Sequence, residues 1–362
     1  MWGIWKKSGI CSLSLLIACS LFVSCKGQAQ KSSVSFTAMN TWMSLQVYSS
    51  SLKKNDTALD ACRNEVLKLE EILSTTIPQS DLWRLNNSDG TEISIQPCTA
   101  DLIDFSLDMY KKTEGAFNPA LYPVIREWGF TTGEYKIPSH ERITELLKFT
   151  DFGQLEFSEF SKNDRSSLTI RLPQNMQLDF GAIGKGFAGD RVIEILKQQG
   201  ITSALIDLGG NIQTLGAKPD GTMWTVGIKN PWISGADGIE GCSVVCSIKI
   251  QSKAVVTSGG YERYFTGEDG KKYIHIFDSK TGCPAESDFA SVTIICESGT
   301  YADALSTSLF AMGKNKAINF WKENTDFDFI LITNEQELFY SQGLQDLIDP
   351  LYDFRKLSLI SL

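Results

Sequence analysis

The chain has 362 residues, a length that allows about two domains or one large one. Hydrophobic residues make up 42% of it and charged residues 21%, which is the composition of a globular protein and excludes extensive disorder. The net charge of −9, without a Lys/Arg cluster, argues against a nucleic-acid partner, because phosphate recognition needs a concentrated basic face.

The first residues have the pattern of a secretory signal peptide. Lys6 and Lys7 form a positively charged start, and residues 10–24 are an uncharged, mostly apolar run. This run is short for a membrane-spanning helix, which needs roughly 20 residues. Ser24 and Cys25, followed by a polar stretch, resemble a bacterial lipobox, in which the cysteine is lipidated. We therefore expect a lipoprotein signal peptide over residues 1–24, lipidation at Cys25 and a tether over residues 25–35.

Cys19 competes with Cys25 for the lipidation site. The residues before Cys19 fit a lipobox more closely, and Phe22 is bulky where the pattern before Cys25 usually has Leu. Cleavage at Cys19 would, however, leave the apolar residues 21–23 exposed on an otherwise polar tether. Cys25 is therefore preferred, and it predicts a bacterial cell-membrane protein anchored by lipid on the extracytoplasmic, periplasmic face.

Hydrophobic spacing predicts the elements that follow in the first half of the chain. They are a strand over residues 36–48 and helices over residues 58–73, 102–112 and 138–148. Asn118 and Pro119 supply an N-cap and a first-turn proline for a short helix that runs towards Trp128.

In the second half, strand-like spacing from Leu168 leads through a glycine-rich turn into a helix. That helix covers residues 187–199 and leads into a strand over residues 203–208, so the segment reads as one βαβ-like unit. Short strands follow, then helices over residues 301–312 and 314–323 and a strand over residues 327–333. Helices and antiparallel strands therefore segregate, which favours an α+β fold over a doubly wound sheet.

The glycine-rich turn that starts at Asp179 has the spacing of a dinucleotide-binding fingerprint. Gly184, Gly186 and Gly189 form GxGxxG at the start of a predicted helix, and Asp207 ends a strand about 20 residues later. A Rossmann oxidoreductase is nevertheless disfavoured, because the glycines come late after the strand and no series of βα units follows.

The same turn suits a phosphate and a metal ion. It offers the acidic strand end at Asp179, backbone groups that glycines leave approachable, and Lys185 at a helix N-terminus. It is not a Walker A loop, because Lys185 precedes Gly186 instead of a Ser or Thr. Taken alone, the segment is also compatible with a plain tight turn whose lysine is solvated.

Asp303 and Thr307 stand at positions i and i+4 on one face of a predicted helix. Mg²⁺ takes oxygen ligands, usually few from the protein and the rest from water and substrate phosphates, so such a pair is sufficient. A structural alternative is that Asp303 complements the helix dipole while Thr307 bonds back to its own helix.

The chain contains only two histidines, which restricts the choice of a general base. His275 lies where a predicted strand runs into a turn, whereas His140 falls in a predicted helix. Histidine titrates near neutral pH and suits proton transfer, although a histidine on a strand is more often structural.

Together these segments resemble the FAD:protein FMN transferase (ApbE-type) family from about residue 36 to 340. The motifs that keep the family's order are Leu178-Asp-Phe-Gly-Ala-Ile-Gly-Lys-Gly-Phe-Ala-Gly-Asp190, Leu208-Gly-Gly-Asn211, Thr257-Ser-Gly-Gly-Tyr261, His275-Ile-Phe-Asp-Ser-Lys-Thr-Gly282 and Ala302-Asp-Ala-Leu-Ser-Thr307. The resemblance implies a mixed-sheet core flanked by helices, an active site in a cleft between two lobes, and a catalytic domain over residues 36–350.

The resemblance also implies the site residues and the reaction. FAD as substrate would contact Met39, Thr76, Ala116, Phe117, Asn118, Asp179, Lys185 and Phe277. Mg²⁺ would bind the Ala182 carbonyl, Asp303 and Thr307. A Thr or Ser hydroxyl of a target protein would attack the FMN-side phosphorus of FAD and release AMP, with His275 as the base and Lys185 steadying a phosphate.

Three positions depart from the family's usual residues and put flavin packing beside them in question: Asn40 replaces Gly, Thr76 replaces an aromatic residue, and Asn118 replaces Asp. The implied partners are extracytoplasmic, flavin-bearing subunits of membrane redox complexes. Two alternatives are hydrolysis of FAD to FMN and AMP, and a flavin-binding lipoprotein without catalysis.

Overall fold

A computed structural model of the chain describes residues 29–155, 168–232 and 243–362. The predicted signal peptide, with Cys19 and Cys25, lies outside these residues. None of the helices in the described ranges combines the length and the apolar character that crossing a membrane would require.

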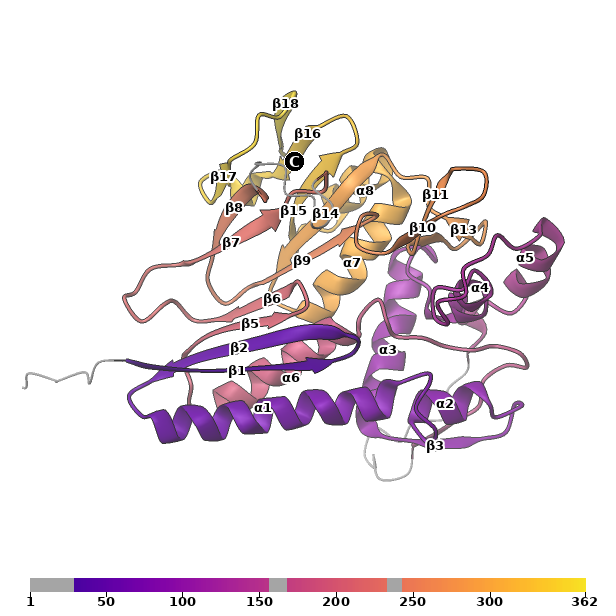
Figure 1. Cartoon of the computed structure of the whole chain (residues 1–362), viewed down its shortest axis with the longest axis horizontal. Coiled ribbons are helices and arrows are strands. Elements are labelled where there is room, and N and C mark those ends of the chain that lie inside the picture. The colour runs from indigo at the N-terminus through magenta and orange to yellow at the C-terminus, as the bar shows by residue number, and fades with distance from the viewer. Residues whose placement is uncertain (1–28, 156–167, 233–242) are drawn as a thin grey trace, which may run out of the picture.

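The core of the fold is a nine-stranded mixed sheet (Figure 1). Its strands are, in spatial order, β1 (Gln30–Ala38), β2 (Thr41–Ser49), β5 (Ser203–Leu208), β6 (Asn211–Leu215), β9 (Ala254–Gly259), β14 (Phe289–Cys296), β15 (Asp328–Thr333), β16 (Glu337–Ser341) and β18 (Lys356–Ile360). Neighbouring strands are antiparallel except β16 and β18, which pair in parallel.

Both faces of this sheet are covered. Helices α1 (Leu52–Leu73), α6 (Gly184–Gln198) and α7 (Gly299–Met312) pack on one face, and α8 (Lys314–Glu323) packs against α7. A three-stranded sheet of β7 (Trp224–Lys229), β8 (Val244–Ile250) and β17 (Ile348–Pro350) lies on the other face. Helix α7 is apolar on most of its faces, and most of its residues are buried against the main sheet and the neighbouring helices, as expected for a core helix.

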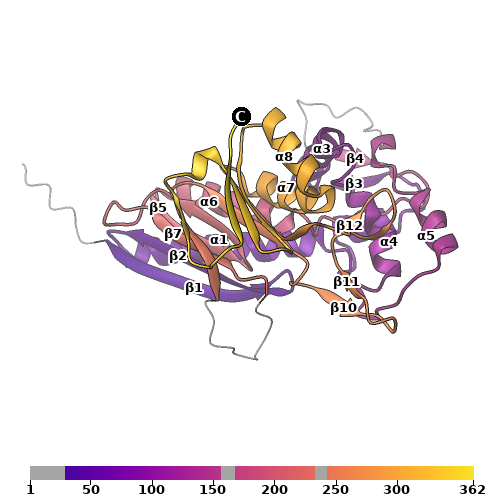
Figure 2. The ribbon, with the colours of Figure 1, turned by 90° about the horizontal axis from the view of Figure 1, so that it is seen from above.

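The remaining elements gather at one end of the main sheet (Figure 2). They are α2 (Asp81–Asn86), α3 (Pro97–Lys112), η1 (Pro119–Leu121), α4 (Tyr122–Glu127), α5 (His140–Leu147), η2 (Phe152–Gln154) and three small strand pairs, β3 (Ile93–Ile95) with β4 (Leu168–Ile170), β10 (Tyr264–Thr266) with β11 (Lys272–Ile274), and β12 (Phe277–Asp278) with β13 (Cys283–Pro284). A short helix, η3 (Gln342–Leu344), follows β16.

The single strand predicted over residues 36–48 is wrong, because this segment belongs to the hairpin β1–β2. The chain reverses at Met39 and Asn40, whose φ angles are 48° and 58°. Positive φ at both central residues is typical of the hairpin turn that matches the twist of the two strands. The turn contains no glycine, so the sequence did not indicate it. Strand β1 begins at Gln30, inside the segment expected to be a tether, and β18 extends the fold beyond residue 350.

The predicted βαβ-like unit is also wrong. Strand β4 pairs with β3 in a separate small sheet, whereas β5 pairs antiparallel with β2 and β6 in the main sheet. The strand before α6 therefore does not lie in the same sheet as the strand after it. The other predicted helices and the strand over residues 203–208 are confirmed, and α6 starts at Gly184, three residues before its predicted start at Phe187.

Candidate active site

Glycines at the start of α6 allow a close crossing with α7. A Cβ atom added at Gly186 would lie 2.2 Å from the carbonyl oxygen of Gly299, and one at Gly189 would lie 2.1 Å from Nε2 of Gln213. Gly184, in contrast, faces open space. Two glycines of the GxGxxG pattern are therefore explained by close packing of α6, Gly186 against α7 and Gly189 against a side chain of β6. This packing and the antiparallel sheet remove the basis for a Rossmann site.

Asp190 on α6 fixes the N-terminus of α7. Its carboxylate accepts hydrogen bonds from the hydroxyl of Ser298 (2.8 Å), the amides of Gly299 (2.6 Å) and Thr300 (3.0 Å), and the hydroxyl of Thr300 (2.7 Å). Ser298 itself caps α7 by accepting from the amide of Tyr301. Asp190 thus holds α6 and α7 in register, a role that the sequence did not predict.

Asp303, 5% exposed, comes from α7 to the first turn of α6. Its Oδ2 accepts a hydrogen bond from the amide of Gly186 at 2.9 Å. Gly186 belongs to the first turn of α6, where an amide has no acceptor within its own helix, and the carboxylate supplies that acceptor. Among the described residues the Ala182 carbonyl accepts no hydrogen bond. The contact therefore places the Asp303 carboxylate at the N-terminus of α6, and the segment that leads into this helix supplies a carbonyl oxygen that accepts no hydrogen bond among the described residues.

Thr307 lies one turn further along α7 and is part of a chain of hydroxyl groups. Its Oγ1 is 3.2 Å from Oγ of Ser258 on β9, which is 2.8 Å from Oγ of Ser306. The Ser306 hydroxyl donates in turn to the backbone carbonyl of Asp303 at 3.0 Å. Thr307 is partly exposed, whereas Asp303 and Ser306 are buried.

The oxygen atoms of Ala182, Asp303 and Thr307 fit a Mg²⁺ ion. A carboxylate, a hydroxyl and a carbonyl are hard donors, and few of them are needed because Mg²⁺ retains water and phosphate ligands. The described residues contain no group of three or more His, Cys, Asp or Glu side chains that could hold a metal, so a zinc-type site is not present among them.

Burial raises the pKa of the Asp303 carboxyl, and the positive charge of Lys185 is the largest opposing influence. The Asn211 side chain, 1% exposed, lies beside the carboxylate and also lowers this pKa. Its Nδ2 nevertheless forms no hydrogen bond of good geometry within the described residues. Lys185 and the Asn211 side chain thus favour the ionised form of the Asp303 carboxyl, which is the form that a cation binds.

The loop that leads to Asp179 is held by hydrogen bonds to η1 and to the end of α2. The Asp179 amide donates to the carbonyl of Pro119 at 3.0 Å, and its Oδ1 accepts from the Gly181 amide at 3.0 Å. Asn86 at the end of α2 holds Leu178 through two hydrogen bonds of 2.7 and 2.8 Å. Burial raises the pKa of Asp179. The hydrogen bond from the Gly181 amide, and then the positive charges of Arg263 and Lys185, lower it.

Lys185 stands at the centre of the site, at the second position of α6. Its charge acts on the carboxylates of Asp179 and Asp303 and on the imidazole of His275. Lys185 is partly buried and forms no ion pair with a carboxylate in the described part of the chain. The ammonium group is therefore available to an anion, as the sequence predicted for a phosphate.

His275, between β11 and β12, is oriented by the backbone of Arg263. The carbonyl oxygen of Arg263 lies 3.1 Å from the His275 amide nitrogen and 3.0 Å from its Nδ1. A carbonyl can only accept, so Nδ1 carries the proton and Nε2 has a free lone pair. Burial lowers the pKa of His275 from 6.5 to about 4, helped by the charges of Arg263 and Lys185. The imidazole is neutral at pH 7 and can accept a proton at Nε2.

The residues predicted to contact FAD lie in two groups. Ala116 to Asn118 adjoin Asp179 through the bond to Pro119, whereas Met39 and Thr76 lie at the C-terminal end of α1, where the Met39 amide donates to Glu70 Oε1 at 2.6 Å. Thr76 is exposed in the turn that follows α1.

Three of these residues have side chains that already pack or form hydrogen bonds within the protein. Phe117 and Phe277 are 2% and 5% exposed and pack in hydrophobic clusters, so their rings are not open to a ligand. The Asn118 amide caps η1 through a bond from Ala120 N at 3.0 Å and donates to the carbonyl of Thr150 at 2.9 Å. An Asn therefore serves as a helix cap where the family usually has Asp.

Fold and site define an α+β protein in which Lys185 on α6 and the candidate metal ligands Asp303 and Thr307 on α7 come from two helices that cross. The sequence matches the ApbE family over residues 39–331. The chain therefore belongs to the ApbE family.

Individual relatives agree with this membership. An FAD:protein FMN transferase of Treponema pallidum is 32% identical and aligns over 89% of this chain and 91% of its own length. One of Klebsiella pneumoniae is 30% identical over 88% and 94%. The crystal structure of the ApbE protein of Thermotoga maritima has a TM-score of 0.76 and 30% identity, over 87% and 98% of the two chains. The apo flavinyl transferase ApbE of Pseudomonas stutzeri has a TM-score of 0.76 and 25% identity, over 88% and 97%.

Proposed function

We propose that this chain is an Mg²⁺-dependent FAD:protein FMN transferase that acts on a Thr or Ser hydroxyl of an extracytoplasmic protein. The observation that carries the proposal is the Gly186–Asp303 hydrogen bond, which places a buried carboxylate at the first turn of α6, the helix that the Ala182 carbonyl precedes. The positive charge of Lys185 lowers the pKa of both this carboxyl and His275. The oxygen ligands and the neutral base therefore share one cation that can bind an anion. The activity carried in the names of the relatives supports the same reaction.

Each residue has a role in that reaction. Nε2 of His275 accepts the proton of the target hydroxyl, whose oxygen forms a bond to the FMN-side phosphorus of FAD. The bond between that phosphorus and the bridging oxygen breaks, and AMP leaves with the electron pair. Lys185 holds a phosphate as a point charge. Mg²⁺ held by Ala182, Asp303 and Thr307 would offset negative charge on the pyrophosphate.

We also propose that the protein is exported and lipid-anchored through Cys25 on the periplasmic face of the membrane. The charged and apolar pattern of the first 24 residues supports this location, where flavin-bearing subunits of membrane redox complexes are suitable acceptors. Mass spectrometry of the mature N-terminus tests it. A lipidated Cys25 is expected, and an unprocessed Met1 or a lipidated Cys19 would contradict it.

The reaction is tested by incubating the protein with FAD, Mg²⁺ and a membrane fraction that contains candidate acceptors. The expected result is a fluorescent flavin band that survives a denaturing gel, together with AMP. FMN and AMP without such a band would indicate hydrolysis, and unchanged FAD would indicate a storage protein. Asp303→Asn is the matched inactive control, because an Asn oxygen can still accept from the Gly186 amide.

A further inference from the structure

Arg263 lies beside the proposed base, although it was not among the residues predicted from the sequence. It directly precedes β10, and its carbonyl oxygen accepts the two hydrogen bonds from His275 described above. Arg263 and His275 are thus paired across the β10–β11 hairpin. The backbone of Arg263 cannot move without moving the imidazole.

The side chain of Arg263 is anchored at one point. Its Nη2 donates to the carbonyl oxygen of Phe130 at 2.6 Å. A guanidinium group carries five N–H donors, and no other partner is present for this one among the described residues. One nitrogen therefore fixes the position of the group, and the other donors stay available.

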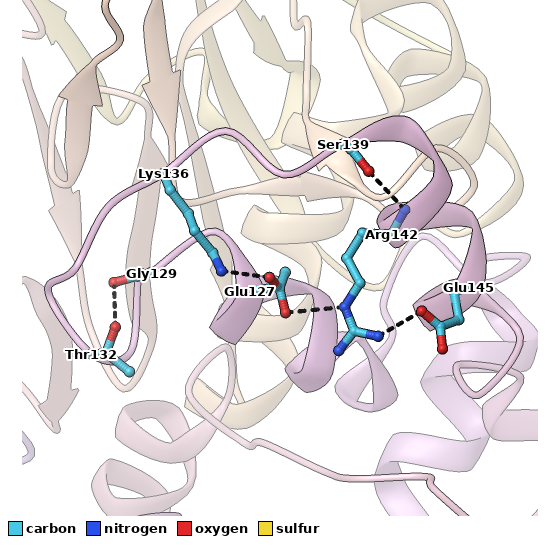
Figure 3. A network of polar contacts seen from close by, with 7 residues as sticks. All are labelled: Glu127, Gly129, Thr132, Lys136, Ser139, Arg142 and Glu145. Carbon is cyan, nitrogen blue, oxygen red and sulfur yellow. Dashed lines mark hydrogen bonds and ion pairs between the residues drawn. The ribbon is translucent and has the colours of Figure 1, made fainter.

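The loop that supplies this anchor is itself held firmly (Figure 3). Glu127 at the end of α4 pairs with Lys136 at 2.6 Å and with Arg142 on α5 at 3.3 Å, which closes the loop between the two helices. Gly129 has φ +87°, and a Cβ atom there would lie 2.1 Å from the carbonyl oxygen of Glu134, so the backbone is closely packed. Phe130 is consequently a fixed support for the guanidinium.

The charge of Arg263 has no counter-charge among the described residues. It forms no ion pair with a carboxylate within the described ranges, and its side chain is exposed. Its charge acts on both Asp179 and His275, and on each of them more strongly than the charge of Lys185 does. Lys185 in turn acts on Asp303 at the oxygen-donor end. Two cations without an ion pair among the described residues, Lys185 and Arg263, therefore both influence His275.

We propose that Arg263 is a phosphate-binding residue of this site and holds the phosphoryl group that lies beside His275. The inference rests on the proposed function, in which His275 takes the proton of the attacking hydroxyl and must adjoin the phosphorus under attack. A pyrophosphate carries charge on two phosphoryl groups, and Lys185 alone is a single point of attachment. The planar fork of an arginine suits two oxygens of one phosphoryl group.

The test compares two ligands that share the isoalloxazine ring but differ in phosphate. Binding of FAD and of riboflavin is measured by flavin fluorescence for the wild type, Arg263→Met and Arg263→Lys. We expect Arg263→Met to weaken FAD binding by about 10- to 100-fold and riboflavin binding by less than about twofold, because charge-assisted hydrogen bonds to phosphate are lost. Arg263→Lys keeps the charge and is expected to fall between the two. Lys271→Met, on the same hairpin and paired with Glu286, is the control and should bind both as the wild type does.

The outcomes separate this inference from the proposed function. If the wild type binds no FAD, the proposed function fails. If it binds FAD and Arg263→Met binds FAD equally well, only the role of Arg263 fails. Equal weakening of FAD and riboflavin, or a lowered melting temperature in both Arg263 variants, would show that the residue merely ties the hairpin to the Phe130 loop and would also overturn the inference.

Discussion

The amide of Gly186 and the carboxylate of Asp303 are joined by a hydrogen bond of 2.9 Å that links the first turn of α6 to the middle of α7. The bond gives an acceptor to an amide of the first helical turn, which has none within its own helix. The positions and charge of the proposed metal ligands therefore depend on how closely the two helices cross. This close crossing requires a glycine at position 186.

Gly186→Ala should separate the two helices. The added Cβ would lie 2.2 Å from the Gly299 carbonyl oxygen, which is backbone and cannot turn aside. We expect a loss of about 1–3 kcal/mol in the free energy of unfolding, measured by urea denaturation, and a loss of activity. Gly184→Ala is the control, because its Cβ meets open space and the change should be below about 1 kcal/mol. Equal stability of the two variants would contradict the crossing.

Asp303→Asn should abolish Mg²⁺-dependent turnover while the protein stays folded. The side chain is buried and hydrogen-bonded, so Asp303→Ala would also leave the Gly186 amide without an acceptor and reduce stability. Asn retains an acceptor and removes the charge that a cation needs. We expect turnover to fall by about 100-fold or more, with an unchanged melting temperature. Wild-type turnover in this variant would exclude Asp303 as a ligand.

Ser258→Ala should weaken the response to Mg²⁺. The Ser258 hydroxyl is the partner of both Thr307 and Ser306, and groups that orient a ligand typically change metal affinity by about 10- to 100-fold. The Mg²⁺ concentration that gives half the maximal rate should rise, and calorimetry should show the same weakening directly. Thr257→Val is matched to it, because Thr257 bonds instead to Thr293 at 2.9 Å and should leave the Mg²⁺ response unchanged.

The rate should be nearly independent of pH from about 6 to 8 at saturating Mg²⁺. Protonation removes the base, so the rate falls only as the pH drops through the pKa of His275, which burial lowers to about 4. His275→Gln should lose most of the activity at every pH. An acid limb centred near 6.5 would contradict this assignment, and His140→Gln leaves His275 as the only histidine for a direct NMR titration.

Local patterns in the sequence predicted much of the secondary structure. Helical spacing gave α8 and strand spacing gave β5 with their observed bounds, because each depends on its own residues. The hairpin turn at Met39 and Asn40 was missed because its φ angles are rare for residues other than glycine and nothing local signals them. The pairing of β4 with β3 depends on segments far apart in the chain, which spacing cannot reveal.

The site was predicted in its chemistry but not in its support. The donors Asp303 and Thr307 share a helix face, so a single segment shows them. Asp190, Ser258 and Arg263 act through contacts with residues distant in the sequence, as in the 108 residues between Asp190 and Ser298. One feature of the sequence could have indicated two of them. Asp190 and Ser258 lie inside the family motifs 178–190 and 257–261 but have no chemical role of their own.

The most direct test is to follow both halves of FAD at once, with the wild type, Mg²⁺ and an acceptor protein that carries the target hydroxyl. The expected result is that each AMP released is matched by one FMN bound to the denatured acceptor through a Thr or Ser, and that Asp303→Asn produces neither. Release of AMP with free FMN and an unmodified acceptor would contradict the proposed transfer.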